Sequence, residues 1–70
     1  MLGREELVNR FTYHKPKGTQ IERYAIIRDK ARDYAIALTD MCPMSRELTR
    51  ATNKLDEVVM LANAAIARNE

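Results

Sequence analysis

A short segment near the N-terminus holds the residues best suited to chemistry. Within residues 11–18 stand an aromatic ring, an imidazole and two lysines, namely Tyr13, His14, Lys15 and Lys17. A tyrosine ring presents a flat face on which a nucleobase can stack, and lysine and histidine donate hydrogen bonds to phosphate oxygens. Pro16 and Gly18 favour an extended loop here. These residue types indicate a site for a nucleotide phosphate.

More cations follow the loop on a segment that we expect to be helical. Thr19 and Glu22 form the T-x-x-E pattern of a capping box, so the free N–H groups of a helix N-terminus should lie beside the loop and favour anions. The cations recur at helical spacing: Arg23, Arg28, Lys30 and Arg32. The competing interpretation is that these are solvated helix residues and that Tyr13 pins the loop to the core. Short basic-aromatic loops are weakly specific, so the pattern alone favours that interpretation.

Catalytic and metal-binding patterns are weak. His14 has no nucleophilic partner at a recognisable spacing, and Cys42 stands beside a proline at a predicted hinge, where a structural thiol is the usual case. Carboxylates on the expected helices have basic neighbours, so solvated ion pairs explain them. We predict a binding protein that is not an enzyme and that uses no metal and no cofactor.

The composition limits both the core and the partners. The chain has 70 residues, no Trp and one Phe, so a single domain over residues 1–70 can build little core, and self-association is the expected remedy. A net charge of +2, with 31% charged residues of both signs, argues against disorder and against a strong grip on long nucleic acid. No apolar run reaches signal-peptide or membrane-spanning length. We expect a cytosolic protein without membrane association.

Two long helices, at about residues 20–41 and 45–68, account for most of the chain. The first carries an apolar stripe at alternating spacings of three and four: Tyr24, Ile27, Ala31, Tyr34, Leu38 and Met41. The second carries two stripes, one of Leu48, Ala51, Leu55, Val58, Ala62 and Ala65, and another of Thr52, Val59 and Ile66. Pro43 should end the first helix, and Ser45 offers the N-cap of the second.

The predicted fold class is all-α, an antiparallel helical hairpin with a short N-terminal helical segment. That segment, Gly3 to Arg10, has apolar candidates for packing on the hairpin: Leu2, Leu7, Val8 and Phe11. Two helices alone cannot cover a second apolar stripe, and the alanine-rich residues 62–67 suit close helix–helix approach. We therefore expect a homo-oligomer with an interface at that segment.

Several groups of residues also carry a family resemblance. They are Phe11–Lys17, Gln20, Arg23-Tyr24, Ile27-Arg28, Cys42-Pro43, Ser45-Arg46-Glu47, Val59-Met60, Ala62-Asn63-Ala64 and Ile66-Ala67-Arg68-Asn69-Glu70. Through them the chain resembles the phage anti-CBASS cyclic-nucleotide sponges, the anti-CBASS and anti-Thoeris hairpin domain. The resemblance spans Phe11 to Glu70 and leaves the first ten residues outside.

The resemblance implies a non-catalytic phage protein that works in the cytoplasm of the infected bacterial host. Such a protein sequesters cyclic dinucleotides such as cyclic GMP-AMP, and cyclic trinucleotides as well, so that CBASS effectors are not activated. Family members are hexamers that hold dinucleotides between pairs of protomers and trinucleotides in separate pockets. A homohexamer is the implied assembly for this chain.

The resemblance also implies roles for single residues. Tyr13 would stack on a base, and Arg28 or Lys30 would meet a phosphate. To these we add the donors beside the ring and the cation one turn beyond the loop: His14, Lys15, Lys17 and Arg23. Asn63 and Arg68 are assigned to a second pocket, for a trinucleotide.

Other classes of function stay open beside the sponge. A small nucleic-acid-binding accessory protein would use the basic residues Arg46, Arg50 and Lys54 together with the loop lysines. A helical adaptor would bind another protein through the spare apolar stripe. An enzyme that hydrolyses the messenger is a further alternative.

Overall fold

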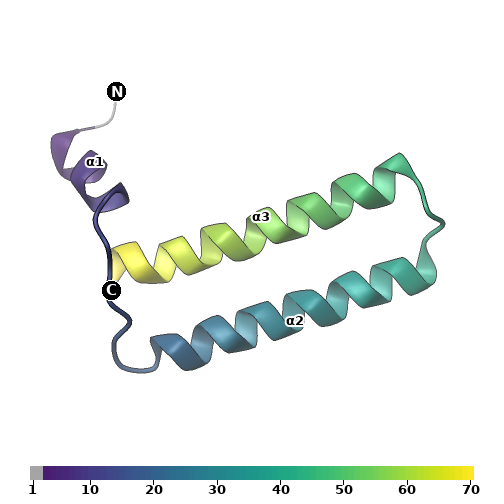
Figure 1. The fold of residues 1–70 in the computed structure, drawn as a ribbon, viewed down its shortest axis with the longest axis horizontal. Coiled ribbons are helices and arrows are strands. Elements are labelled where there is room, and N and C mark those ends of the chain that lie inside the picture. The colour runs from purple at the N-terminus through teal and green to yellow at the C-terminus, as the bar shows by residue number, and fades with distance from the viewer. Residues whose placement is uncertain (1–2) are drawn as a thin grey trace.

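The computed structural model describes residues 3–70, which form three helices and no strand. Helix α1 spans Arg4–Arg10, α2 spans Gln20–Met41 and α3 spans Arg46–Asn69. Helices α2 and α3 run antiparallel side by side, the loop before α2 crosses the open end of this hairpin, and α1 lies beyond the end of α3 on the side away from α2 (Figure 1). The all-α hairpin predicted from the sequence is confirmed, and the two long helices lie close to the expected ranges.

The start of α2 differs from the predicted capping box. The side chain of Thr19 makes no capping hydrogen bond, because its backbone (φ −87°, ψ 10°) is not in the extended conformation that an N-cap residue adopts. Instead, the Gln20 side-chain oxygen accepts from the Lys17 N–H at 3.1 Å. Gly18, with φ at 58°, supplies the left-handed turn that brings Lys17 back over Gln20. The predicted capping box is therefore wrong: the Gln20 side chain holds an N–H of the preceding loop, and does not cap a free N–H of α2.

The hinge forms as the sequence predicts. Helix α2 ends at Met41, where the chain becomes extended at Cys42 (φ −114°, ψ 143°), the residue before Pro43. The Cys42 N–H still donates to the Leu38 carbonyl at 2.9 Å. Ser45 then caps α3, since its hydroxyl oxygen accepts from the Leu48 N–H at 3.1 Å. The Ser45 cap is confirmed.

The face of α2 that packs on α3 differs in part from the predicted stripe. Tyr24, Ile27, Ala31 and Leu38 are half-buried, as expected. Tyr34 and Met41, however, are 57% and 72% exposed, and Ala35 and Cys42 are half-buried in their place. At roughly 3.6 residues per turn, Cys42 lies about five full turns after Tyr24, whereas Met41 points about 100° away. The seven-residue spacing drifted off the buried face because the helix is straight.

Helix α3 takes its buried face from both predicted stripes. Its half-buried apolar residues include the stripe members Leu48, Leu55, Val59, Ala62 and Ile66, together with Ala64 and Ala67, which belong to neither stripe. The other members of the first stripe, Ala51, Val58 and Ala65, are exposed. Neither predicted stripe is therefore buried as a whole: each contributes some residues to the buried face of α3 and leaves others exposed.

The apolar residues of α1 do not pack into the hairpin. Leu7, Val8 and Phe11 are 42%, 58% and 86% exposed, so their predicted packing is wrong; Leu2 lies outside the described residues. Polar contacts attach α1 to the end of α3 instead. The Asn9 amide donates to the Arg68 carbonyl at 3.1 Å, and the Arg68 guanidinium donates to the Arg10 carbonyl at 3.4 Å.

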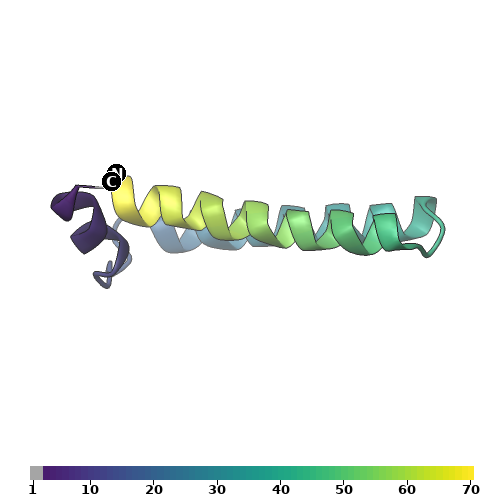
Figure 2. The same cartoon turned by 90° about the horizontal axis from the view of Figure 1, so that it is seen from above.

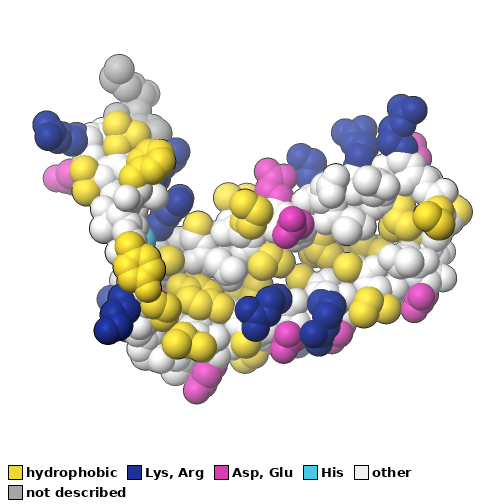
Figure 3. Space-filling model, viewed as in Figure 1, with side chains coloured by type: hydrophobic (Ala, Val, Ile, Leu, Met, Phe, Trp, Pro, Cys, Tyr) yellow, Lys and Arg dark blue, Asp and Glu magenta, His cyan; other side chains and the backbone are white. Residues whose placement is uncertain are grey.

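The hairpin is a slab that is one layer of helices thick (Figure 2). The Cα atoms extend over 44 × 32 × 12 Å, and the radius of gyration is 15.3 Å, against about 11 Å for a compact domain of this length. Within residues 3–70 no hydrophobic residue is fully buried. Apolar side chains gather between α2 and α3 and remain open on the face seen in Figure 3. Few small domains are stable with so little core, which is consistent with the self-association expected from the sequence.

The Ser45 cap gives a test of this fold. We expect Ser45→Ala to lower the free energy of unfolding by about 1 kcal/mol, because the Leu48 N–H loses its acceptor. Thr19→Ala is the matched control, since the Thr19 hydroxyl caps nothing. Urea denaturation followed by circular dichroism at one fixed protein concentration measures both. Equal losses in the two variants would contradict the assignment of the caps.

Candidate functional site

A groove of about 500 Å³ lies where the loop after α1 meets the end of α3 and the first turns of α2. The segment from α1 through the loop contributes Arg10, Thr12, Tyr13 and His14. Helix α2 contributes Tyr24 and Arg28, and α3 contributes Asn63, Ala64, Ala67 and Arg68. Three arginines and two tyrosines line the groove, and no acidic residue does. Such a lining favours an anionic ligand that carries a ring system.

Five predicted site residues come together in this groove: Tyr13, His14, Arg28, Asn63 and Arg68. The sequence-based prediction assigned these residues to two separate pockets, whereas within one protomer all five line the same groove. Tyr13 is 81% exposed, so its ring is available to a ligand. Arg28 and Arg68 are also exposed and approach the groove from α2 and α3. The groove thus offers a stacking surface with cations on two sides.

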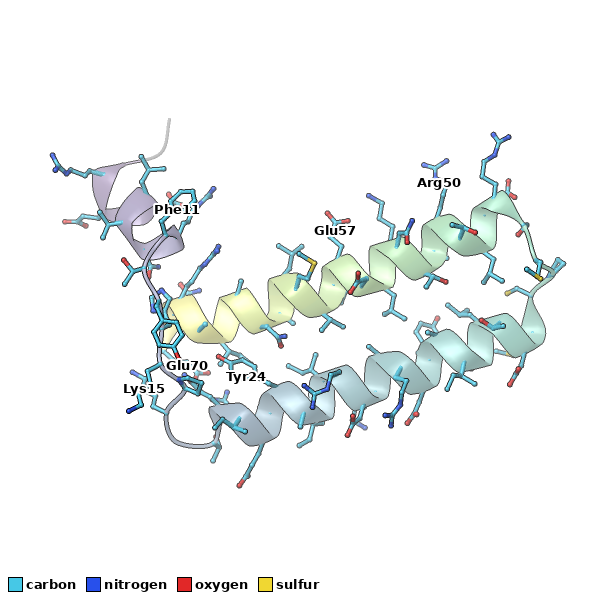
Figure 4. All side chains as sticks on the ribbon, viewed as in Figure 1. Phe11, Lys15, Tyr24, Arg50, Glu57 and Glu70 are labelled. Carbon is cyan, nitrogen blue, oxygen red and sulfur yellow. The ribbon has the colours of Figure 1, made fainter. Side chains whose placement is uncertain are left out.

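The other predicted site residues lie elsewhere: Lys15, Lys17, Arg23 and Lys30 do not line the groove. Lys15 is exposed on the loop and points away from the hairpin, as labelled in Figure 4. Lys17 and Lys30 are likewise exposed. Arg23 is bound to Glu70 at the base of α2. Their predicted roles in ligand binding stay predictions.

Sequence reasoning missed Arg10, Thr12 and Tyr24 as groove residues. Tyr24 was expected to be core, yet it lies one turn before Arg28 on α2, and that i, i+4 spacing is a signal that the two share a face. In Figure 4 its side chain points from α2 towards the end of α3. Arg10 reaches the groove because the end of α1 contacts the end of α3 at Arg68, and no local pattern indicates that.

His14 has one ring nitrogen committed to the backbone. Its Nε2 lies 2.9 Å from the Asn9 carbonyl oxygen, and a carbonyl can only accept, so Nε2 carries a proton and donates. This leaves Nδ1 as the nitrogen with capacity for a ligand. The bond also ties the loop to the end of α1, which sets the position of the neighbouring Tyr13.

Asn63 presents a buried acceptor in the groove wall. Its Oδ1 is inaccessible to solvent and has no hydrogen-bond partner within the described part of the chain. An unsatisfied buried carbonyl is unfavourable by about 1–3 kcal/mol. Because solvent does not reach Oδ1, this acceptor is also closed to a ligand in the groove.

A cluster of polar contacts at the base of the loop involves Gln20, Arg23 and Glu70. The two nitrogens Nη1 and Nη2 of Arg23 donate to the two carboxylate oxygens of Glu70, the first at 2.7 Å. The Gln20 amide donates to the same carboxylate at 3.2 Å. These hydrogen bonds, from Arg23 first and Gln20 second, lower the pKa of the Glu70 carboxyl from 4.5 to about 2. The bond to Glu70 likewise raises the pKa of Arg23.

Metal ligands do not gather in the part of the chain that the structure describes: no three His, Cys, Asp or Glu side chains lie close enough to hold an ion. None of the helices of residues 3–70 combines the length and apolar character needed to cross a membrane.

A groove of stacking rings and arginines on a helical hairpin defines a class of small helical proteins that bind phosphate-bearing ligands. The comparison with protein families makes the assignment specific: the chain belongs to the Acb2/Tad1 hairpin-domain family, the anti-CBASS and anti-Thoeris sponges, whose model matches residues 4–67. Members of this family bind and sequester cyclic oligonucleotides and are not known as enzymes. No curated protein and no solved structure matches the chain.

The extent of the match corrects the sequence-based resemblance at both ends. The family model begins at residue 4, not at Phe11, so α1 is part of the family domain. It ends at residue 67, so Arg68, Asn69 and Glu70 lie beyond it. The contact of Glu70 with Arg23 therefore joins a matched residue to one outside the match.

The lowered pKa of Glu70 predicts a specific pH dependence. Because the folded-state pKa lies below the ordinary value, the ion pair contributes stability that is complete above about pH 4.5 and is lost as the pH falls towards about 2. We expect wild-type protein to melt at a higher temperature than Glu70→Gln at pH 7, with the gap closing over that range. Thermal melts at one protein concentration measure it. A gap that persists unchanged to pH 2 would contradict the ion pair.

Proposed function

We propose that this protein is a phage anti-defence sponge that captures cyclic dinucleotide immune messengers, such as cyclic GMP-AMP, without degrading them. The observation that carries the proposal is the groove lined by Tyr13, Arg28 and Arg68 and free of acidic residues. A cyclic dinucleotide presents two bases and two phosphates. The tyrosine matches the bases by stacking and the arginines match the phosphates by charge-assisted hydrogen bonds.

Self-association is part of the proposal. A messenger must stay bound at the concentrations that trigger effectors, which demands nanomolar affinity, or about −12 kcal/mol. One protomer offers an open groove, and a second protomer would enclose the ligand in a site that is formed before it arrives. The uncovered apolar side chains of the slab support such an assembly, since they include Ile21, Ile26, Ile36, Val58 and Leu61, each more than half exposed. A homohexamer is the assembly that we propose.

Finer features of the sponge are also proposals. Asn63 and Arg68, which both line the groove, would contact a cyclic trinucleotide. The protein would work in the cytoplasm of the infected bacterium, where the messengers of CBASS are made, and would keep their effectors inactive.

The basic residues of α3 give less support to nucleic-acid binding. Arg50 lies on the side of α3 that faces away from α2 (Figure 4), and Lys54 pairs with Glu57 at 3.4 Å. Neither lines the groove. Arg46 and Arg50 are exposed cations, but with Lys54 in an ion pair they do not form a basic surface large enough for long nucleic acid. The net charge of the chain is only +2.

Calorimetry with a panel of cyclic dinucleotides, cyclic trinucleotides and linear dinucleotides tests the proposal. We expect selective, nanomolar uptake of cyclic ligands by a protein that light scattering shows to be an oligomer at micromolar concentration. Heating the complex should release intact ligand, as a sponge requires. A monomer, a preference for long oligonucleotides or a cleaved product would each contradict the proposed mechanism.

Tyr13→Ala tests the stacking surface. We expect it to weaken dinucleotide binding by about 1–3 kcal/mol through lost stacking, while helicity and assembly stay unchanged, since the side chain is largely exposed. Tyr13→Phe keeps the ring and should bind nearly as well as wild type. Calorimetry and light scattering on both variants give the answer. If Tyr13→Ala dissociates the oligomer, the ring supports the assembly instead.

A further inference from the structure

The groove is built from segments that are far apart in the sequence, so something must hold them in register. Tyr13 and His14 come from the loop, Arg28 from α2 and Arg68 from α3. Gln20, Arg23 and Glu70 form a polar clasp at the base of the loop, outside the groove. We propose that this clasp positions the loop for ligand binding, so that Glu70 sets affinity without touching the ligand. The inference rests on the proposed function.

Gln20 is the centre of the clasp. It is 3% exposed and is the one fully buried residue among residues 3–70. Its side-chain oxygen accepts from the Lys17 N–H at 3.1 Å, and its side-chain nitrogen donates to the Glu70 carboxylate at 3.2 Å. A single amide therefore joins the end of the loop to the end of α3. Among the described residues, no other side chain forms hydrogen bonds to both the loop and the end of α3.

Arg23 fixes the Glu70 carboxylate that Gln20 needs. The two donors of its guanidinium meet both carboxylate oxygens, which sets the plane of the carboxylate as well as its place. Both side chains are about 40% exposed, so solvent screening keeps the contribution of the pair to stability modest. Its geometric effect is larger, because it aims one carboxylate oxygen at the Gln20 amide.

The loop is tied to α3 at both of its ends. Before Tyr13, the Asn9 side chain donates to the Arg68 carbonyl and the Asn9 carbonyl accepts from His14. After Tyr13, Lys17 is held through Gln20 to Glu70. Tyr13 itself is 81% exposed, so the two ties set its position more than its own packing does. Releasing one tie would spread the ring over more positions and lower the fraction of protein that is ready to bind.

Electrostatics and positioning predict opposite results for Glu70→Gln. Removing a negative charge near an anionic ligand should tighten binding if charge alone matters. Loss of the clasp should weaken it, because the loop becomes mobile. The sign of the change in affinity therefore separates the two effects.

The experiment is calorimetric titration of cyclic GMP-AMP into wild type, Glu70→Gln and Glu57→Gln at a temperature where circular dichroism shows all three folded. Glu57→Gln is the matched control, since it removes the same charge from an exposed ion pair on the outer side of α3 (Figure 4). We expect Glu70→Gln to bind about fivefold to tenfold more weakly and Glu57→Gln to bind like wild type. Arg23→Glu should also bind weakly, and adding Glu70→Arg to it should restore part of the affinity.

A measurement without ligand reports the clasp directly. Hydrogen exchange at the Lys17 amide, followed by NMR, should be faster in Glu70→Gln than in wild type, because the Gln20 acceptor is no longer held. Gln20→Ala should speed it as well, which serves if Glu70→Gln proves too unstable to titrate. If wild type binds and Glu70→Gln binds equally well, the inference about the clasp is wrong while the proposed function still holds. Wild type that binds no cyclic oligonucleotide would overturn the proposed function and this inference with it.

Discussion

The structure depends on one constraint: two helices in a single layer can bury one seam between them and nothing more. In residues 3–70 that seam leaves every hydrophobic residue at least partly exposed. At about 25 cal/mol per Å² of apolar area, a half-buried side chain contributes much less than a core one. The folded conformation therefore depends on specific local interactions, namely the Ser45 cap, the Pro43 hinge and the polar contacts at the open end of the hairpin. A partner surface is the natural remaining source of stability.

The open end of the hairpin holds the directional contacts that define the groove. Loop, α1 and both long helices meet there, and their contacts are polar: Asn9 with Arg68, His14 with Asn9, and Gln20 and Arg23 with Glu70. Directional hydrogen bonds can define a groove where packing cannot, because each fixes an angle as well as a distance. The family to which the chain belongs uses hairpins of this kind to sequester cyclic oligonucleotides.

The sequence predicted where the helices begin and end better than which of their faces are buried. Pro43 and Ser45 act within a few residues of themselves, so local chemistry was enough to place the hinge and the cap. The buried face of α2 was predicted wrongly at Tyr34 and Met41, because a seven-residue repeat drifts around a straight helix. The groove was predicted in part: Tyr13, Arg28 and Arg68 line it, whereas Arg10 joins only because the end of α1 contacts the end of α3. Such long-range contacts leave no periodic signal in the sequence.

The groove also joins the two ends of the chain. Its walls include Tyr13 and Arg68, and the nearby hydrogen bond from Asn9 to Arg68 spans 59 positions in the sequence. A ligand that bridges them would act as a reversible cross-link that closes almost the whole chain into one loop. Closing a long loop opposes unfolding in the same sense as a disulfide of equal span, but it lasts only while the ligand stays bound. The captured molecule would then serve as a temporary structural part of the protein that holds it.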